Sequence, residues 1–142
     1  MIQKTAGFFF ILFITICAWE DLRYRRIRII WYILFGLIGI CLNAAQESIF
    51  WSWMTAAWPG GVLLILSKLT DGAIGTGDAW LIIVSAFYIN AGQLLLIVGI
   101  AFFLSFIWAL FLCVLFMIQG RNAAKKNMPF AAFFLFACIL LI

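Results

Sequence analysis

One uninterrupted apolar stretch decides the fold of this chain: from Leu94 to Ile118 the sequence reads LLLIVGIAFFLSFIWALFLCVLFMI. The stretch contains no charged residue and no proline. A helix needs about 20 such residues to cross the hydrocarbon core of a bilayer, so this stretch is long enough to span a membrane. Inside lipid a helix also satisfies its own backbone hydrogen bonds. The stretch therefore predicts a transmembrane helix.

The rest of the chain has the same apolar character. Of its 142 residues, 68% are hydrophobic and only 10% are charged, and the mean hydropathy is +1.24. A typical soluble domain is about 25% charged, so this chain lacks the polar surface that a water-soluble fold requires. Its length accommodates one domain. We therefore expect a single domain over residues 1–142, an all-α, polytopic membrane helix bundle whose outer surface faces the lipid bilayer.

Short polar breaks divide the chain into apolar segments, which predict about six transmembrane helices. The segments cover about Thr5–Trp19, Ile29–Ala45, Ile49–Leu66, Ile74–Ile89, Leu94–Ile118 and Met128–Ile142. The first, fourth and sixth are short for a span, so they must include flanking residues or lie in thinned bilayer. Within the third segment, Pro59-Gly60-Gly61 predicts a kink or a close contact with another helix.

The basic residues fall on one side of these breaks. Of the nine Lys and Arg residues, all except Lys4 follow the first, third or fifth segment. By the positive-inside rule these breaks face the cytoplasm. Membrane insertion therefore explains the net charge of +4, and we expect no nucleic-acid partner.

The residue types that are missing exclude several kinds of chemistry. The chain has no histidine, which excludes histidine-based catalysis and histidine metal sites. Its four cysteines lie inside apolar segments without C-x-x-C spacing, and buried thiols of this kind behave as small apolar residues. We expect no metal site and no cofactor, so the chemistry is left to the carboxylates.

The sharpest candidate among the five acidic residues is Asp78. It follows Gly75-Thr76-Gly77 and directly precedes an apolar run, which places its carboxyl at the mouth of the fourth segment. An ionisable residue at a membrane boundary is costly to hold and is a functional candidate. The two glycines allow positive φ or the close approach of a second backbone. The alternative is that Asp78 is only a helix N-cap.

Asp21 is the second candidate, at the point where the first segment leaves the membrane. Here too a structural alternative exists, because Asp21 could pair with Arg25 at helical spacing while the neighbouring arginines act as a stop signal. Considered together, Asp21 and Asp78 predict a pair of carboxylates that can act as acid and base. Two close carboxylates share one proton because they do not both ionise easily. The ionised member can then activate water and the protonated one can protonate an amide.

These residues resemble the motifs of the type IV prepilin peptidases, membrane aspartyl proteases of the Gly-x-Gly-Asp class. The resemblance rests on Asp21-Leu22-Arg23 with Ile27 after the first segment, on Gly75-Thr76-Gly77-Asp78, and on Lys126-Asn127-Met128-Pro129-Phe130 before the last segment. It covers roughly residues 8–142. The resemblance implies that Asp21 and Asp78 are the catalytic pair and that Gly75 and Gly77 support the motif.

The resemblance further implies a function. The substrate would be a prepilin-like membrane protein whose short basic leader is cut at the cytoplasmic face of the prokaryotic inner membrane, in a type IV pilus or secretion system. Glu20 and Asp71 are candidate contacts for that basic leader. The paired-cysteine loop of larger, methylating members is missing, so we expect protease activity without methyltransferase activity.

Two residues depart from the family pattern beside the proposed catalytic pair. Arg28 follows Ile27 where relatives usually continue Ile-Pro-Asn, and Trp80 stands where a lysine is common. These departures leave a second hypothesis open, in which the chain is a non-catalytic membrane scaffold or an inactive relative.

Overall fold

The computed structural model describes residues 2–24, 26–43, 49–70, 75–118 and 130–141. In these residues all regular structure is helical, and no strand occurs. The helices are α1 (Ile2–Tyr24), α2 (Ile29–Asn43), α3 (Ile49–Leu69), α4 (Thr76–Ser85), α5 (Ala91–Ile118) and α6 (Phe130–Leu141). The all-α fold class that the apolar segments predict is therefore confirmed for the described part of the chain.

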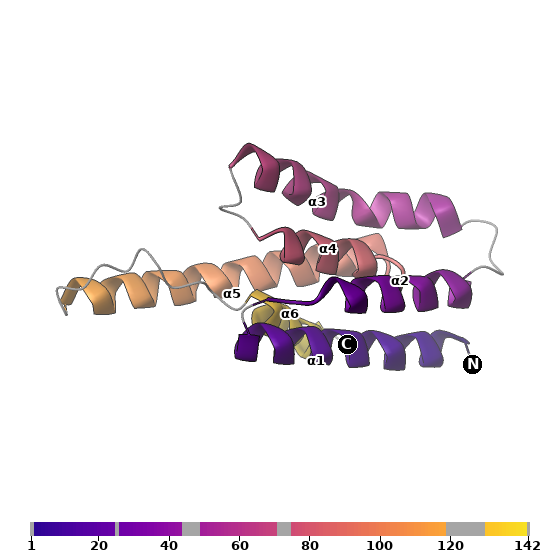
Figure 1. Ribbon diagram of the computed structural model, residues 1–142, viewed down its shortest axis with the longest axis horizontal. Coiled ribbons are helices and arrows are strands. Elements are labelled where there is room, and N and C mark those ends of the chain that lie inside the picture. The colour runs from indigo at the N-terminus through magenta and orange to yellow at the C-terminus, as the bar shows by residue number, and fades with distance from the viewer. Residues whose placement is uncertain (1, 25, 44–48, 71–74, 119–129, 142) are drawn as a thin grey trace.

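The helices lie roughly parallel or antiparallel to one another in a bundle (Figure 1). The chain runs back and forth, so α1 ends where α2 begins, and α3 ends at the same end of the bundle where α4 begins (Figure 1). Helix α3 packs against α4, and α6 packs against both α1 and α5. This arrangement brings the start of α4 and the end of α1, which are distant in sequence, to the same end of the bundle.

One helical stretch, Ala91–Leu115 within α5, is long and apolar enough to cross a membrane. Among the described residues the shorter apolar helices are Ile29–Leu42, Thr76–Ser85 and Phe130–Leu141. Large apolar side chains are exposed on every helix, for example Phe8, Ile33, Trp58, Trp80, Phe103 and Ile139. An outer surface of this kind is typical of a protein that contacts lipid or another apolar partner.

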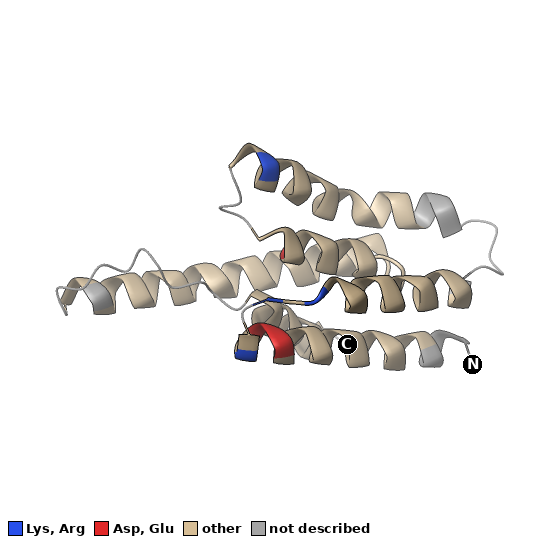
Figure 2. Ribbon diagram, in the orientation of Figure 1, with Lys and Arg blue, Asp and Glu red and all other residues tan. Residues whose placement is uncertain are grey.

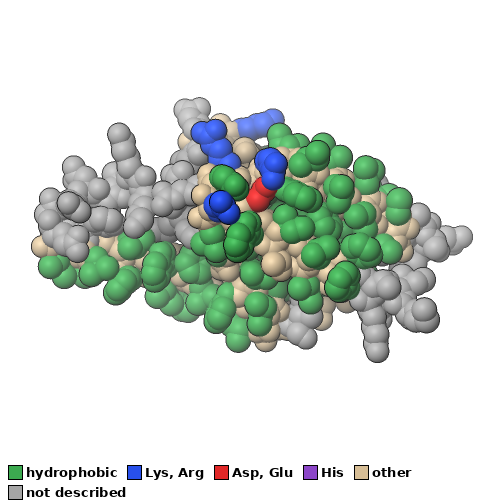
Figure 3. Space-filling view, turned by 60° about the horizontal axis from the view of Figure 1, so that its bottom comes forward, with side chains coloured by type: hydrophobic (Ala, Val, Ile, Leu, Met, Phe, Trp, Pro, Cys, Tyr) green, Lys and Arg blue, Asp and Glu red, His purple; other side chains and the backbone are tan. Residues whose placement is uncertain are grey.

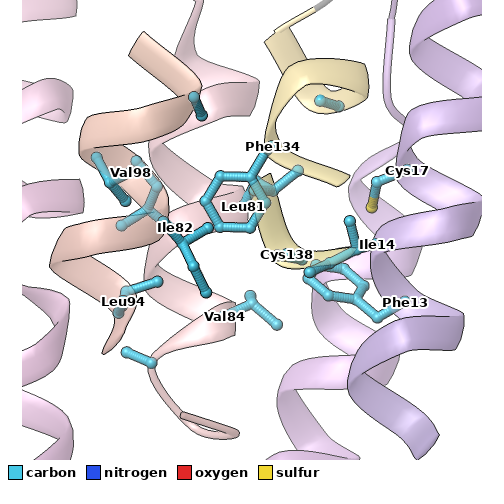
Figure 4. Packing of buried hydrophobic residues seen from close by; sticks show 14 of the residues in the cluster. Phe13, Ile14, Cys17, Leu81, Ile82, Val84, Leu94, Val98, Phe134 and Cys138 are labelled. Carbon is cyan, nitrogen blue, oxygen red and sulfur yellow. The ribbon is translucent and has the colours of Figure 1, made fainter. Parts of the chain in front are cut away.

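All six helices contribute buried side chains to the core of the bundle. Figure 4 shows the part of the core between α1, α4, α5 and α6, which includes Phe13, Ile14, Cys17, Leu81, Ile82, Leu94, Val98, Phe134 and Cys138. Helix α4 is the central member, because Ala79, Leu81 and Ile82 are completely buried. Tight packing on several sides fixes the position of α4, and with it the position of the acidic residue in its first turn.

The close contact expected at Pro59-Gly60-Gly61 occurs between α3 and α4. Helix α3 continues through Pro59. A Cβ atom added to Gly60 would lie 2.6 Å from Cγ1 of Ile83 and 2.9 Å from the carbonyl oxygen of Ala79. Only a residue without a side chain fits this contact, so Gly60 allows α4 to lie directly against α3.

Candidate active site

The charged side chains that the structure describes gather at one end of the bundle (Figure 2), while large apolar side chains are exposed on every helix. Figure 2 shows acidic residues at the end of α1 and the start of α4, with basic residues beside them. In Figure 3 basic side chains surround an acidic one at this same end. The fold therefore brings Asp21 and Asp78 into one polar region, although they are 57 positions apart in the sequence.

Asp78 lies in the first turn of α4, at the polar end of that helix and before its apolar part begins. The N-cap of α4 is Gly75, with φ −63° and ψ 122° and without a side-chain capping bond. The backbone N–H of Asp78 donates to the carbonyl oxygen of Gly75, at 3.2 Å. Asp78 is thus the third residue of the helix and not its N-cap, which removes the structural alternative raised by the sequence.

The glycines around Asp78 avoid close contacts and do not have an unusual backbone conformation. The φ of Gly75 is open to any residue, but a Cβ atom there would lie 3.1 Å from Oδ2 of Asp78. A Cβ atom on Gly77 would lie 3.3 Å from the hydroxyl oxygen of Tyr32. Both glycines therefore leave room for polar groups, of which one is the proposed catalytic carboxylate.

Tyr32 of α2 fixes the backbone next to Asp78. Its hydroxyl donates a hydrogen bond to the carbonyl oxygen of Gly77, at 2.9 Å. The side chain is 5% exposed and meets the ring of Phe13 edge to face, with 6.2 Å between centroids. A buried phenol held on two sides is a rigid support, so the carbonyl group that precedes Asp78 has a fixed position.

Asp21, which is half-buried near the end of α1, is held by α6. Its Oδ2 atom accepts a hydrogen bond from the backbone N–H of Ala131, at 3.1 Å. Ala131 is the second residue of α6, and the N-terminus of a helix carries unpaired N–H groups and a partial positive charge. This bond favours the ionised form of Asp21.

The carboxyls of Asp21 and Asp78 interact electrostatically. Burial raises the pKa of Asp78 above its ordinary value, and the negative charge of Asp21 raises it further. Both effects favour the protonated form of Asp78.

The sequence suggested Glu20 and Asp71 as contacts for a basic leader, and the structure describes only Glu20. Glu20 is 3% exposed, and its carboxylate forms an ion pair with Arg28, at 2.6 Å. It is thus already engaged within the chain. Asp71 lies outside the described residues.

The cysteines are free thiols, with Cys17 and Cys138 buried and Cys41 and Cys113 exposed. Within the described ranges, no three His, Cys, Asp or Glu residues come together in a group that could hold a metal ion.

Sequence reasoning missed three contacts that shape the site. Tyr32 is one tyrosine within an apolar segment, and no local pattern marks it as a donor to Gly77. The bond from Ala131 to Asp21 joins residues from opposite ends of the chain. The pairing of Glu20 with Arg28 crosses the connection between α1 and α2, where helical spacing gives no guide. Arg28 did carry a signal, since it interrupts the expected motif.

The profile of the type IV leader peptidase family matches residues 8–118 of the chain. This range includes Asp21, Asp78 and both glycines of the motif, and it confirms the family that the sequence motifs suggested. The motif that ends at Phe130 lies beyond the matched range. Comparisons with curated proteins and with solved structures each found no match.

Proposed function

The chain belongs to the type IV leader peptidase family, and from this we propose that it is a membrane aspartyl endopeptidase that removes the short basic leader of prepilin-like proteins. One observation supports the aspartyl mechanism most directly: the end of α1, which carries Asp21, lies at the end of the bundle where α4 begins with Asp78 in its first turn (Figure 1). Burial raises the pKa of Asp78 there, and the charge of Asp21 raises it further. Aspartic proteases use a pair of this kind, in which like charges keep one member protonated.

In the proposed reaction, ionised Asp21 accepts a proton from a water molecule as the water oxygen attacks the scissile carbonyl carbon. Protonated Asp78 donates a hydrogen bond and then its proton to the carbonyl oxygen. Collapse of the tetrahedral intermediate breaks the C–N bond. Asp78 takes a proton back from one hydroxyl group as the C=O bond re-forms, and the leaving amine takes up the proton that Asp21 carries. Water is consumed and no covalent enzyme intermediate forms.

We further propose that the helices form a multi-pass bundle in the prokaryotic inner membrane, with the polar end towards the cytoplasm. The apolar side chains exposed on all six helices support a lipid environment. Basic residues also lie at the polar end: Arg23 and Lys68 are in the last turns of α1 and α3, and Arg26 and Arg28 lie between α1 and α2. The positive-inside rule expects such residues on the cytoplasmic side. The leader of the substrate would then meet Asp21 and Asp78 where its own helix enters the membrane.

The test is cleavage of a prepilin-like substrate by the purified full chain in lipid vesicles, with the product analysed by mass spectrometry. We expect one cut, at the junction between the basic leader and the apolar helix, and the same rate with and without a metal chelator. A non-catalytic scaffold or an inactive relative would leave the substrate intact. Inhibition by the chelator that added metal reverses would contradict the aspartyl mechanism.

A further inference from the structure

Glu20 and Arg28 form a clamp directly beside Asp21. The guanidinium group of Arg28 contacts Oε1 of Glu20 through Nη2, at 2.6 Å, and through Nε, at 2.7 Å. The backbone N–H of Arg28 donates to Oε2, at 3.0 Å. Both oxygens of the carboxylate are therefore engaged by one residue, and one of the three contacts fixes the main chain at the start of α2.

The clamp is unlike an ordinary surface ion pair. Glu20 is 3% exposed, and a buried carboxylate without a partner is strongly destabilising. A surface pair holds two mobile side chains and contributes little. Here the acidic partner is confined by the bundle and the basic partner is held through its backbone as well. The end of α1 is therefore tied to the start of α2 at one defined place.

A second tie connects α2 to the other aspartate. Arg28 directly precedes α2 and Tyr32 lies in its first turn, and the hydroxyl of Tyr32 donates to the carbonyl oxygen of Gly77. Glu20 immediately precedes Asp21, and Gly77 immediately precedes Asp78. Each of the two connections thus reaches the residue next to a proposed catalytic aspartate, and both start at the N-terminal end of α2.

We propose that Glu20 and Arg28 are positioning residues. Their contact holds the N-terminal end of α2 against the end of α1, and Tyr32 holds α2 against the start of α4, so that α2 sets the separation of the Asp21 and Asp78 carboxyls. This inference rests on the proposed function. It gives Glu20 a role within the enzyme in place of contact with the substrate leader. It also gives Arg28 a role, although Arg28 interrupts the expected sequence motif.

The experiment measures kcat and KM in lipid vesicles for wild type, Glu20→Gln, Arg28→Met and the double variant, on a substrate with a basic leader and on one whose leader is neutral. Glutamine keeps the shape of Glu20, and Arg26→Met is the control because it removes the same charge from the same connection. Misplacing reacting groups by about 1 Å costs on the order of 100-fold in rate. We expect each single change to lower kcat about 10- to 100-fold with either leader, with KM changed less than about twofold.

The double variant should be no slower than the slower single variant, because residues that act as one unit are not additive. It also leaves no buried charge unpaired, so it reports on positioning even if a single variant fails to reach the membrane. The control should stay within about twofold of wild type. Arg28→Lys, which keeps the charge and the backbone N–H, should restore part of kcat.

Three results would overturn the clamp while wild type still cleaves: a higher KM for Glu20→Gln on the basic leader alone, losses that multiply in the double variant, or kcat unchanged in both single variants. The first of these would identify Glu20 as a leader contact. A wild type that does not cleave would refute the proposed function itself, and the clamp's role in catalysis with it.

Discussion

The two aspartates have different surroundings, and we expect them to have different roles in the proposed reaction. Asp21 accepts an N–H bond from the N-terminal turn of α6, which stabilises negative charge. Asp78 is half-buried in the first turn of α4, where burial and then the charge of Asp21 raise its pKa. Asp21 is therefore the expected base, and Asp78 the expected acid.

This assignment predicts how cleavage depends on pH. Asp78 must keep its proton, and it loses that proton as the pH rises through its raised pKa. Ordinary carboxyl groups titrate near pH 4. We expect the alkaline limb of the kcat profile to lie above that range. The native state also binds more protons than the unfolded state in this interval, so wild-type stability should fall as the pH rises through it. Asp78→Asn should lose that slope in melting temperature; an unchanged slope would contradict the assignment.

The hydroxyl groups of Tyr32 and Tyr88 make similar hydrogen bonds to helix carbonyl groups. Comparing the two tyrosines distinguishes an effect on the site from an effect on the stability of the fold. Tyr32 donates to Gly77 beside Asp78, whereas Tyr88 donates to the carbonyl oxygen of Phe35, remote from Asp78. Each Tyr→Phe change removes one side-chain hydrogen bond, which should lower the free energy of unfolding by about 1 kcal/mol. Only Tyr32→Phe should also lower kcat, by about 10-fold. Equal kcat values for the two variants would show that the Tyr32 bond does not serve the site.

At the scale of elements, the contact between α3 and α4 holds the helix that carries Asp78. Helices in lipid associate through close packing, since apolar burial from water does not drive them together there. Gly60 supplies this packing, whereas a Cβ atom on the adjacent Gly61 would have no neighbour within 4 Å. Two neighbouring glycines of the same helix are thus expected to respond differently to the same substitution.

Gly60→Ala should lower the free energy of unfolding by about 1–3 kcal/mol, because the backbone at Ala79 has to move. Gly61→Ala should be neutral or stabilising by up to about 1 kcal/mol, since alanine favours the helix. Thermal unfolding in detergent compares the two variants, and Gly60→Ala should also cleave more slowly. Equal melting temperatures would show that the α3–α4 contact is not tight.

The elements were largely predictable from the sequence and the contacts between them were not. Apolar runs define where helices occur, because lipid leaves the backbone few other choices. Their ends were less predictable: α1 continues through Glu20 to Tyr24, and α4 stops at Ser85 before a turn. The motif spacing indicated Asp21 and Asp78, but the donors to these residues come from tertiary packing. Nothing local in the sequence links Ala131 to Asp21.

For the whole molecule, the charges predict an orientation in the membrane. Lys68, in the last turn of α3, and Arg26 and Arg28, between α1 and α2, lie at the end of the bundle where α1 ends and α4 begins (Figure 1). The connection between α4 and α5 lies at the opposite end (Figure 1). Positive residues remain in the cytoplasm during insertion. A reporter fused after Ser67 should therefore read as cytoplasmic, and one fused after Asn90 should not. Opposite readings would place both aspartates on the wrong side for the proposed substrate.

The most direct measurement is the rate of leader release by wild type, Asp21→Asn, Asp78→Asn and the double variant, each reconstituted in lipid vesicles at equal amounts. Asparagine keeps the shape of aspartate and removes the acid–base function, which contributes about 10²- to 10⁴-fold to rate. We predict a loss of this size in each single variant and no further loss in the double variant, since the two carboxyls act as one unit. Near-wild-type release by either single variant would contradict the paired-aspartate mechanism.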